Sequence, residues 1–334
     1  MNTDYKTKSI AAFVEERNAS KQLFTAGPAS LLSENLTGLM PCFGRGDREY
    51  SDVEETVLNK LKEMTGHKLI ARMQGSASLA LEIMSMNFLH GRVLVVDTGY
   101  YSKRMSWLAH SAKRRTGTIR EIEEVNWKDL DSVAGQFDWI VACSVETSCG
   151  LKIGIESLQQ VADKHGAKLM LDATASIGLE SGHELADTIA YSSCKGLFGL
   201  TGACFIAFNK EPVYEVDSFY LNLSTHINKK MTGPYHAITS LADVLPKHNE
   251  FREAVRINKE KFIKDYNEWV IYDEQHQPLL CTFVACDIQS QNSKAILYRP
   301  RSELRGSVVC HLGEVHLGSK AEGEIQESLI AAKL

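Results

Sequence analysis

The sequence predicts an α/β protein with a mostly parallel seven-stranded sheet, helices on both faces of that sheet, and a small C-terminal α+β domain. Between residue 69 and about residue 208, short β-branched runs alternate with helical stretches, which is typical of a parallel sheet wound with helices. After Pro234 this alternation gives way to a long polar stretch of helical character. The chain of 334 residues is also longer than one core usually supports, which favours a large and a small domain.

Seven apolar runs supply the predicted strands of the sheet. They are residues 69–73, 93–97, 118–121, 139–143, 168–172, 188–191 and 204–208. The clearest helix between them is predicted over residues 155–165, because Leu158, Val161 and Ala162 share one face and Gly166 follows as a stop.

The same pattern divides the chain into three parts. We expect a large cofactor-binding domain over residues 15–235, connecting helices over 236–268 with a break at Pro246, and a small domain over 269–334. The N-terminal residues 1–25 are expected to pack on the small domain. Within the small domain we predict strands at 280–285 and 308–311 and a last helix that starts at Gly323.

Charge and cysteine usage limit the classes of partner. The net charge of −5 is spread along the chain, and the short basic cluster at residues 113–115 lacks the aromatic residues of a nucleic-acid surface, so we expect no nucleic-acid partner. No apolar run approaches a membrane span, and the N-terminal residues lack the apolar region of a signal peptide, which predicts a cytoplasmic protein without a membrane role. The eight cysteines form no CxxC pair, so we expect reduced thiols and no metal site.

Three segments carry candidate chemistry, and the first is a small-residue turn. Gln74, Gly75, Ser76 and Ala77 follow a predicted strand and open a helix, where backbone N–H groups and the helix dipole can bind a phosphate. An ordinary strand-to-helix turn capped by Ser76 is the alternative.

The other two segments each contribute one ionisable side chain. Asp172 ends an apolar strand, at the sheet edge where ligands of parallel sheets bind, and its carboxylate can keep a pyridine nitrogen protonated. Lys195 follows the next strand and a run of small residues, where a desolvated amine becomes a nucleophile toward aldehydes. Taken singly, Asp172 could be a turn residue and Lys195 a surface lysine. Their order after a phosphate-binding turn favours the chemical interpretation.

With these segments in view, the chain resembles the class V aminotransferases of fold type I, which depend on pyridoxal 5'-phosphate. Among them it is most similar to the 2-aminoethylphosphonate:pyruvate transaminases and more distantly to the alanine:glyoxylate transaminases. The resemblance runs from residues 23–28 to residues 312–315, nearly the whole chain. The motifs that carry it are MQGSASLALE from Met73, TGYYSKRM from Thr98, ETSCG from Glu146, LDATASIG from Leu171, SSCKG from Ser192 and TGPYH from Thr232.

The resemblance implies a role for each matching residue. Lys195 holds the cofactor as a Schiff base, Asp172 pairs with the pyridine nitrogen, and the phosphate binds to the turn of Gly75, Ser76 and Ala77. It also implies that Tyr101 stacks on the cofactor ring, that Thr147 contacts the ring hydroxyl, and that Thr174 packs on the opposite face of the ring. Thr232 is implied to reach the cofactor phosphate of the neighbouring subunit. The contact by Thr232 implies a homodimer whose active sites are shared between subunits.

The implied reaction is transfer of an amino group between a small amine and a small 2-oxo acid such as pyruvate, in two half-reactions through pyridoxamine phosphate. 2-Aminoethylphosphonate or a related phosphonate is the expected amine. A lyase or another non-transaminating enzyme of the same fold stays open as an alternative, as does a catalytically degenerate protein that only binds the cofactor.

The chain departs from the family at the substrate's anionic group. The family arginine that binds a carboxylate or phosphonate falls on Val308, which cannot bind an anion. The candidate residues for binding the anionic group in its place are Arg299, Arg301 and Arg305 before Val308, together with Gly27, Arg45 and Arg48 in the N-terminal part. For the arginines, a place on the solvated surface is the alternative.

Two cysteines are candidates for catalysis. Cys194 stands beside Lys195, where relatives carry Asn, Gln or His, which implies a weaker contact to the phosphate, and it does not match a desulfurase, whose nucleophile lies on a mobile loop of the small domain. Cys310 lies nearer that region but in an apolar strand, so packing is its expected role.

Overall fold

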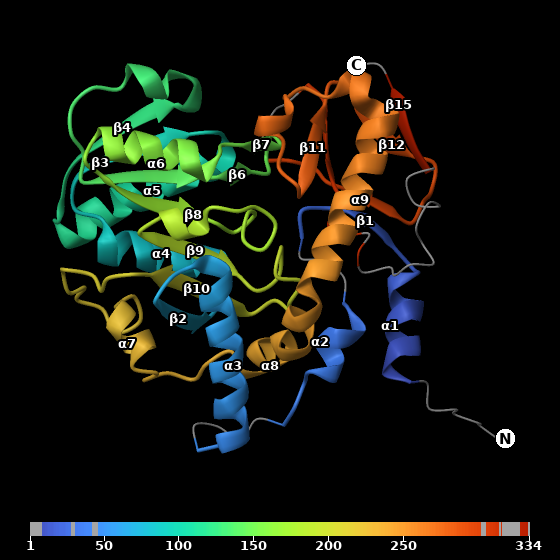
Figure 1. Ribbon diagram of the computed structural model, residues 1–334, viewed down its shortest axis with the longest axis horizontal. Helices are drawn as coiled ribbons and strands as arrows, with labels where there is room; N and C mark the ends of the chain where they lie inside the picture. The colour runs from blue at the N-terminus through green and yellow to red at the C-terminus, as the bar shows by residue number, and fades with distance from the viewer. Residues whose placement is uncertain are drawn as a thin grey trace.

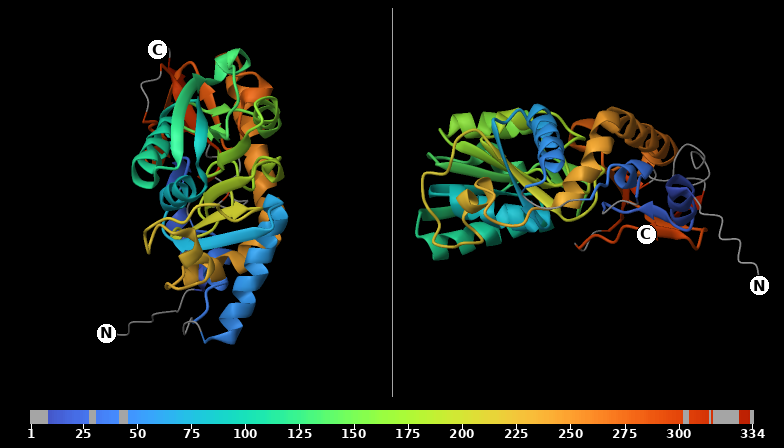
Figure 2. Two further views of the ribbon diagram at one scale, coloured as in Figure 1. Left: turned by 90° about the vertical axis from the view of Figure 1, so that its left-hand side faces the viewer. Right: turned by 90° about the horizontal axis from the view of Figure 1, so that it is seen from below.

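The computed structural model describes residues 9–27, 31–41, 46–301, 305–313, 315 and 328–332. A large part built on one wide sheet lies beside a smaller part made of two-stranded sheets (Figures 1 and 2). The long helix α9 (His248–Tyr266) runs along the smaller part (Figure 1). This arrangement is the fold class that the sequence predicts.

The seven-stranded sheet has the strand order β2-β10-β9-β8-β5-β3-β4. Its strands are β2 (Leu69–Gln74), β3 (Gly91–Asp97), β4 (Ile119–Asn126), β5 (Trp139–Cys143), β8 (Lys168–Asp172), β9 (Thr188–Ser192) and β10 (Ala203–Phe208). Each strand overlaps one of the seven predicted runs. Within this sheet β10 runs antiparallel to both of its neighbours, and the remaining pairs are parallel. The carboxyl ends of β2, β5, β8 and β9 therefore meet at one edge.

Helices cover both faces of the sheet because its strands are apolar on both sides. Along β8, Leu169 and Leu171 belong to one buried cluster and Met170 belongs to the opposite one. The first cluster is completed by α3 (Arg48–Thr65), α6 (Ile155–Lys164) and α8 (Tyr235–Val244), and the second by α4 (Ala77–Phe88), α5 (Tyr100–Thr116) and α7 (Leu223–Ile227).

Three two-stranded sheets are described in the small part. β11 (Cys281–Val284) pairs with β14 (Ser307–Cys310), β12 (Asp287–Ser290) with β15 (Leu329–Ala332), and the N-terminal β1 (Gln22–Phe24) with β13 (Ala295–Leu297). Phe262 of α9 packs with Phe24, Val284 and Leu329 in one buried cluster. The long helix thus joins strands from both ends of the chain.

Short elements complete the chain. They are α1 (Ile10–Asn18), α2 (Ser33–Thr37), the pair β6 (Val145–Glu146) and β7 (Leu151–Lys152), and the 3-10 turns Trp127–Ser132, His183–Leu185, Leu245–Lys247, Asn267–Trp269 and Glu274–His276. The turn Leu245–Lys247 contains Pro246 and separates α8 from α9, at the predicted break.

The predicted final helix is wrong where the structure describes that region. Residues 329–332 form β15, whose backbone pairs with β12 and whose Leu329 is buried. Pairing with β12 gives these four residues more backbone hydrogen bonds than an isolated helical turn would supply. Residues 316–327 lie outside the described ranges.

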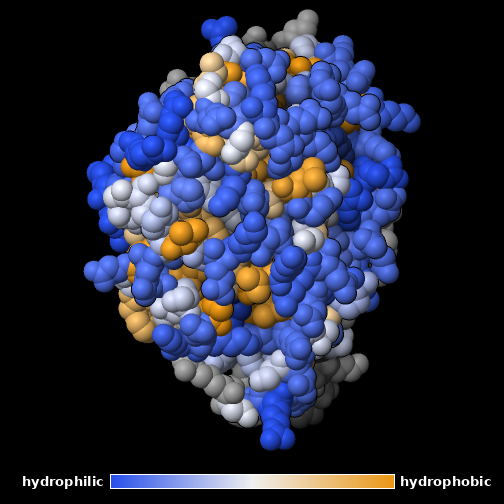
Figure 3. Space-filling model, turned by 60° about the vertical axis from the view of Figure 1, so that its left-hand side comes forward, coloured by the Kyte–Doolittle hydropathy of each residue, from blue (hydrophilic) through white to orange (hydrophobic). Residues whose placement is uncertain are grey.

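The surface is mixed in character. The face in Figure 3 is mostly hydrophilic, with hydrophobic residues in small separate groups. No helix in the described ranges combines the length and the apolar character that crossing a membrane requires. The same ranges hold no group of three His, Cys, Asp or Glu side chains placed to bind a metal ion.

Candidate active site

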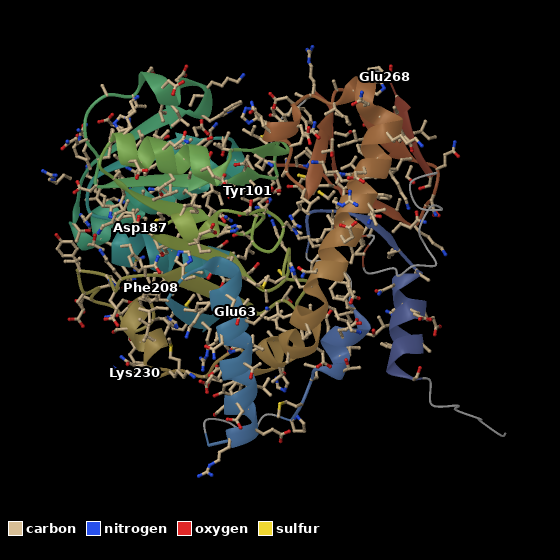
Figure 4. All side chains as sticks on the ribbon, viewed as in Figure 1. Glu63, Tyr101, Asp187, Phe208, Lys230 and Glu268 are labelled. Carbon is tan, nitrogen blue, oxygen red and sulfur yellow. The ribbon has the colours of Figure 1, made fainter. Side chains whose placement is uncertain are left out.

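Asp172 and Lys195 lie at the carboxyl edge of the sheet, as expected from the ends of their strands. Asp172 is the last residue of β8 and is 3% exposed, and Lys195 follows the end of β9 by three residues. The Lys195 Nζ atom is 5.8 Å from the centroid of the Tyr101 ring. Tyr101 lies on the side of the large part that faces the small part (Figure 4). The predicted amine and the predicted stacking ring are therefore together.

The Asp172 carboxylate accepts hydrogen bonds at both of its oxygens. Its Oδ1 accepts from the backbone N–H of Thr174 at 3.0 Å and from the Thr174 hydroxyl, and its Oδ2 accepts from Arg104 Nη2 at 2.8 Å. The Arg104 guanidinium also lies 5.0 Å from the Tyr101 ring centroid and donates to Ser78 Oγ at 3.3 Å. Charged donors of this kind stabilise the ionised form of a carboxylate.

Arg104 is a site residue that the sequence interpretation missed. It stands three residues after Tyr101 in α5, so the two side chains lie on one face of the helix. That spacing inside the motif TGYYSKRM was the available signal.

The turn that carries Lys195 is held in a constrained shape. The Phe198 N–H donates to the Lys195 carbonyl at 2.9 Å, and the Gly199 N–H donates to the Ser193 carbonyl at 2.7 Å. A Cβ atom at Gly196 would collide with the Ile177 carbonyl, so only glycine fits beside the lysine. Phe198 has a φ of +56°, a conformation that non-glycine residues rarely adopt outside functional turns.

A buried carboxylate at Glu146 positions the start of α5. It is fully buried and accepts from the backbone N–H groups of Tyr101 at 2.8 Å and Ser102 at 3.0 Å. Burial raises the pKa of Glu146, although hydrogen bonds from Ser148, Ser102 and Tyr101 oppose the rise. Glu146 therefore fixes the backbone that presents the Tyr101 ring.

The predicted phosphate turn offers donors at the start of α4 but not at Gly75, whose N–H donates to the Gly202 carbonyl at 3.0 Å. Ser76 is the N-cap residue of α4, but its side chain makes no capping hydrogen bond, and the residue is exposed. This geometry does not support the alternative of a turn capped by the Ser76 hydroxyl. A Cβ atom at Gly75 would come within 2.7 Å of Leu79 Cδ2, which favours glycine there. The N-terminus of a twelve-residue helix supplies positive partial charge at this point.

Two hydroxyl groups are buried near Tyr101. Thr147 is 1% exposed, and its Oγ1 makes no hydrogen bond within the described part of the chain. The Tyr298 hydroxyl, from the small part, is also buried without a hydrogen bond of normal geometry among the described residues. Burial and the nearby Tyr101 raise the pKa of Tyr298, although the neighbouring Thr147 hydroxyl opposes the rise. Buried unsatisfied hydroxyls are unfavourable and are typical of sites that receive a ligand.

The substrate candidates are more scattered. Gly27 follows β1 with a φ of +105°, Arg48 is exposed at the start of α3, and Arg305 is exposed, while Arg45 lies outside the described residues. Val308 is 2% exposed and pairs with Phe283 in the sheet of β11 and β14, so that position offers no polar group.

Arg301 is the small-domain arginine with a described contact at the candidate site. Its Nη1 lies 3.4 Å from the Tyr100 hydroxyl, and its guanidinium carbon is 5.6 Å from the Tyr100 ring centroid. The Tyr100 and Tyr101 rings meet edge to face with centroids 5.3 Å apart. Arg301 thus contacts Tyr100, whose ring packs against Tyr101, the ring close to Lys195.

Among the described residues, no hydrogen bond connects Thr232 with Lys195 or Asp172. It is exposed and borders a separate cavity of about 230 Å³, together with Arg72 and Gln74. This cavity lies at the end of β2, behind the phosphate turn.

Comparisons with known proteins bear on the fold and the class. No family model matches the chain. It is 25% identical over 254 residues to a 2-aminoethylphosphonate--pyruvate transaminase of Pseudomonas aeruginosa, a match that covers 68% of each chain. The solved alanine--glyoxylate aminotransferase of Nostoc sp. superposes with a TM-score of 0.74 at 15% identity, over 89% of this chain and 94% of the other. The chain has the fold of the class V aminotransferases, fold type I.

A second solved structure has the same fold. The aspartate aminotransferase of Thermus thermophilus superposes with a TM-score of 0.73 at 17% identity, covering 92% of this chain and 99% of that one. Aminotransferases of this class use pyridoxal phosphate. The residues present fit that group, since they provide an amine, a buried carboxylate, an unsatisfied Thr147 hydroxyl and an uncapped helix N-terminus.

Proposed function

We propose that this aminotransferase moves an amino group between a small amine and a small 2-oxo acid such as pyruvate, with 2-aminoethylphosphonate or a related phosphonate as the amine. The convergence of Lys195, Asp172 and Tyr101 beside the unsatisfied hydroxyl of Thr147 carries the reaction type. The choice of amine is supported by the similarity to the transaminase of Pseudomonas aeruginosa and to transaminases of the same name from Pseudomonas fluorescens and Pseudomonas putida, at 22–26% identity.

In this proposal the bound pyridoxal phosphate supplies an electron sink that stabilises negative charge at the donor carbon. Asp172, whose oxygens accept from Arg104 and Thr174, would pair with the protonated ring nitrogen. Tyr101 would cover one face of the ring, and Thr147 would donate to the ring hydroxyl. The turn of Gly75, Ser76 and Ala77 would hold the phosphate.

Lys195 has two tasks in the proposed reaction. Its Nζ would hold the cofactor covalently, and once a donor amine had displaced it the same Nζ would accept the proton lost from the donor carbon. Its position over the Tyr101 ring keeps it on one face of the site. The turn through Gly196 and Phe198 fixes that position.

For the substrate's anionic group we propose Arg301. Val308 is buried between strands, and Arg301 approaches the site from the small part through Tyr100. A guanidinium there can pair with a phosphonate or a carboxylate through two parallel hydrogen bonds. Gly27, Arg45, Arg48 and Arg305 remain untested candidates for the same task.

We also propose a two-fold homodimer in which Thr232 reaches the partner's cofactor phosphate. Thr232 is exposed, and the nearby Phe219 and Tyr220 are 65% and 48% exposed, as expected for residues that a second subunit covers. The mass of 37.2 kDa per chain makes the dimer easy to recognise by sedimentation.

A lyase of the same fold is the second candidate, and the buried Val308 favours it because the family's anion-binding arginine is missing there. A lyase would return the cofactor to its starting form after each turnover. A transaminase that is given only the amine would stop with the cofactor as pyridoxamine phosphate.

The absorption spectrum of the purified protein tests the proposal. With pyridoxal phosphate we expect a visible band that is absent in Lys195→Ala and that one small amine, tried among 2-aminoethylphosphonate and alanine, converts to the pyridoxamine form. Conversion by an amine other than 2-aminoethylphosphonate would keep the reaction and replace the substrate. A band that no amine converts would favour the lyase, and a chain that binds no cofactor would exclude both.

A further inference from the structure

The buried carboxylate of Glu54 connects three elements outside the Lys195 site. Glu54 belongs to α3 and is 2% exposed. It accepts from the Tyr50 hydroxyl at 2.8 Å, from Arg72 Nε on β2 at 2.7 Å, and from Lys229 Nζ in the segment after α7. Burial alone would raise the pKa of Glu54, but the bonds from Lys229, Arg72 and Tyr50 lower it. The carboxylate is therefore charged in the folded protein.

The two cations lead to two segments that carry predicted phosphate contacts. Arg72 lies two residues before Gln74, where β2 ends and the phosphate turn begins. Lys229 lies three residues before Thr232. A Cβ atom at Gly233 would collide with the Arg72 guanidinium, so the Thr232 segment lies directly against Arg72. Glu54 thus ties the phosphate turn and the Thr232 segment to the same helix.

The Thr232 segment depends on this tie for its position. Lys229 has a φ of +52°, a left-handed conformation that is unfavourable for a non-glycine residue and persists only where neighbouring contacts hold it. Backbone hydrogen bonds to the end of α7 hold Lys229 and Lys230, at 3.0 and 3.1 Å. Beyond them Thr232 borders the cavity of about 230 Å³, which leaves that side of the segment without packing.

We propose that Glu54 is a positioning residue, which holds Thr232 of one subunit where it can reach the cofactor phosphate of the partner subunit. This inference rests on the proposed function and on the proposed dimer. A single hydroxyl contact tolerates displacements of only about 0.5 Å, so a segment that loses its ion pair loses the contact. The effect should therefore appear in recognition of the phosphate and not in recognition of the ring.

The first test replaces Lys229 with Met. Lys229 is 52% exposed in its side chain, so the buried pair of Glu54 and Arg72 stays intact in this variant. We expect the affinity for pyridoxal phosphate to fall about tenfold, as for the loss of one charge-assisted contact, with the affinity for pyridoxal, which has no phosphate, unchanged. Lys229→Arg should retain the wild-type affinity. Equal losses for both ligands, or no loss, would overturn the proposal.

A matched control is available in Lys247→Met. Lys247 is 51% exposed and pairs with Glu34 at 2.9 Å, again between segments far apart in the chain. This variant should bind both ligands as the wild type does. Glu54→Gln is a second test, although it leaves Arg72 buried without its charged partner and should lower the unfolding temperature. If it folds, it should show the same selective loss as Lys229→Met.

Mixed dimers test whether the contact crosses between subunits. One subunit carries Lys195→Ala, its partner carries Lys229→Met, and borohydride then labels the cofactor bound at the remaining Lys195. That site is served by the intact Lys229 of the other chain, so labelling should occur at wild-type cofactor concentrations. When both substitutions are on one chain beside a wild-type chain, labelling should need about tenfold more cofactor. The reverse pattern would overturn the proposal.

The same experiments separate failure of this inference from failure of the proposed function. A wild-type protein that binds no pyridoxal phosphate would refute the proposed function itself. A wild-type protein that binds it in preference to pyridoxal, with unchanged binding in the Lys229 variants, would refute only the role of Glu54.

Discussion

At the scale of single residues, Thr147 keeps a buried hydroxyl that has no hydrogen bond within the described part of the chain. We predict that Thr147→Val weakens cofactor binding by about fivefold, since one neutral hydrogen bond contributes about 1 kcal/mol. The unfolding temperature without cofactor should stay the same or rise, because the unsatisfied group is gone. Titration with pyridoxal phosphate and thermal unfolding measure the two effects.

Thr188→Val is the control for Thr147→Val. The Thr188 hydroxyl is also buried, but it donates to the Ala207 carbonyl at 3.2 Å, away from the candidate site. Its loss should lower the unfolding temperature and leave cofactor affinity unchanged. A Thr147→Val protein that is destabilised without cofactor, yet binds it normally, would contradict the assigned contact.

Arg301 provides a second prediction at this scale. Arg301→Gln should raise KM for an anionic amine by about tenfold to a hundredfold, because a charged hydrogen bond contributes about 1.5–3 kcal/mol, with a smaller change for an uncharged amine. Steady-state kinetics with both amines measures the difference. The exposed Arg299, two residues earlier, gives the matched control in Arg299→Gln. Equal effects on both amines would remove Arg301 from substrate recognition.

Sequence reasoning reached some of these residues and not others, for a physical reason. Lys195, Asp172 and the phosphate turn each follow a strand within a few residues, so local pattern was enough to find them. Arg301 was predicted only as one of three candidate arginines before Val308, and Tyr298 was not predicted, because both come from the small part and meet Tyr100 and Tyr101 only through tertiary packing. No local pattern encodes that meeting.

At the scale of elements, single residues fix both ends of α5. Glu146 accepts from its first N–H groups, and Gly117 closes it in the left-handed conformation with a φ of +69°. Nothing lies within 4 Å of a Cβ atom at Gly117, so a substitution there changes backbone strain without a collision.

We predict that Gly117→Ala lowers the free energy of unfolding by about 1–2 kcal/mol, the cost of left-handed backbone for a residue with a Cβ. Gly46→Ala is the control, because its surroundings are equally open and its φ is not in the left-handed region. That variant should be neutral or slightly stabilising. Denaturant unfolding of the two variants provides the comparison, and equal effects would contradict the argument from backbone conformation.

The strands were predictable because buried apolar runs end at turns, but their directions were not. Residues 204–208 read as one more apolar run, and only the structure places β10 antiparallel between β2 and β9. Periodicity reports which face of a strand is buried and carries no information on direction. The final strand β15 was missed because Leu, Ile and Ala suit a helix as well as a strand.

At the scale of the whole molecule, buried histidines tie stability to pH. Burial lowers the pKa of His183, in the large part, to about 4 and that of His311, in the small part, to about 3. Both stay neutral in the folded protein while the unfolded chain takes up protons below its ordinary pKa of about 6.5. Their contribution to stability is therefore complete above pH 6.5 and is lost as the pH falls toward 4.

We predict that the free energy of unfolding decreases through this window by about 1.4 kcal/mol per pH unit for each such histidine. His183→Gln should flatten the dependence by that amount, as measured by denaturant unfolding between pH 4 and 7. His236→Gln, at an exposed position, serves as the control. An unchanged slope in His183→Gln would show that other groups govern the acid sensitivity.

The position of β10 has a consequence for how the protein is made. β2 and the phosphate turn are synthesised early, yet β2 joins the sheet through β10, where Gln74 pairs with Ala203. Until the ribosome has released that later strand, β2 has no neighbour in the sheet and its apolar residues remain uncovered. Under the proposed function the early half of a nascent chain therefore cannot yet hold the cofactor's phosphate, and premature termination before residue 208 should leave aggregation-prone fragments.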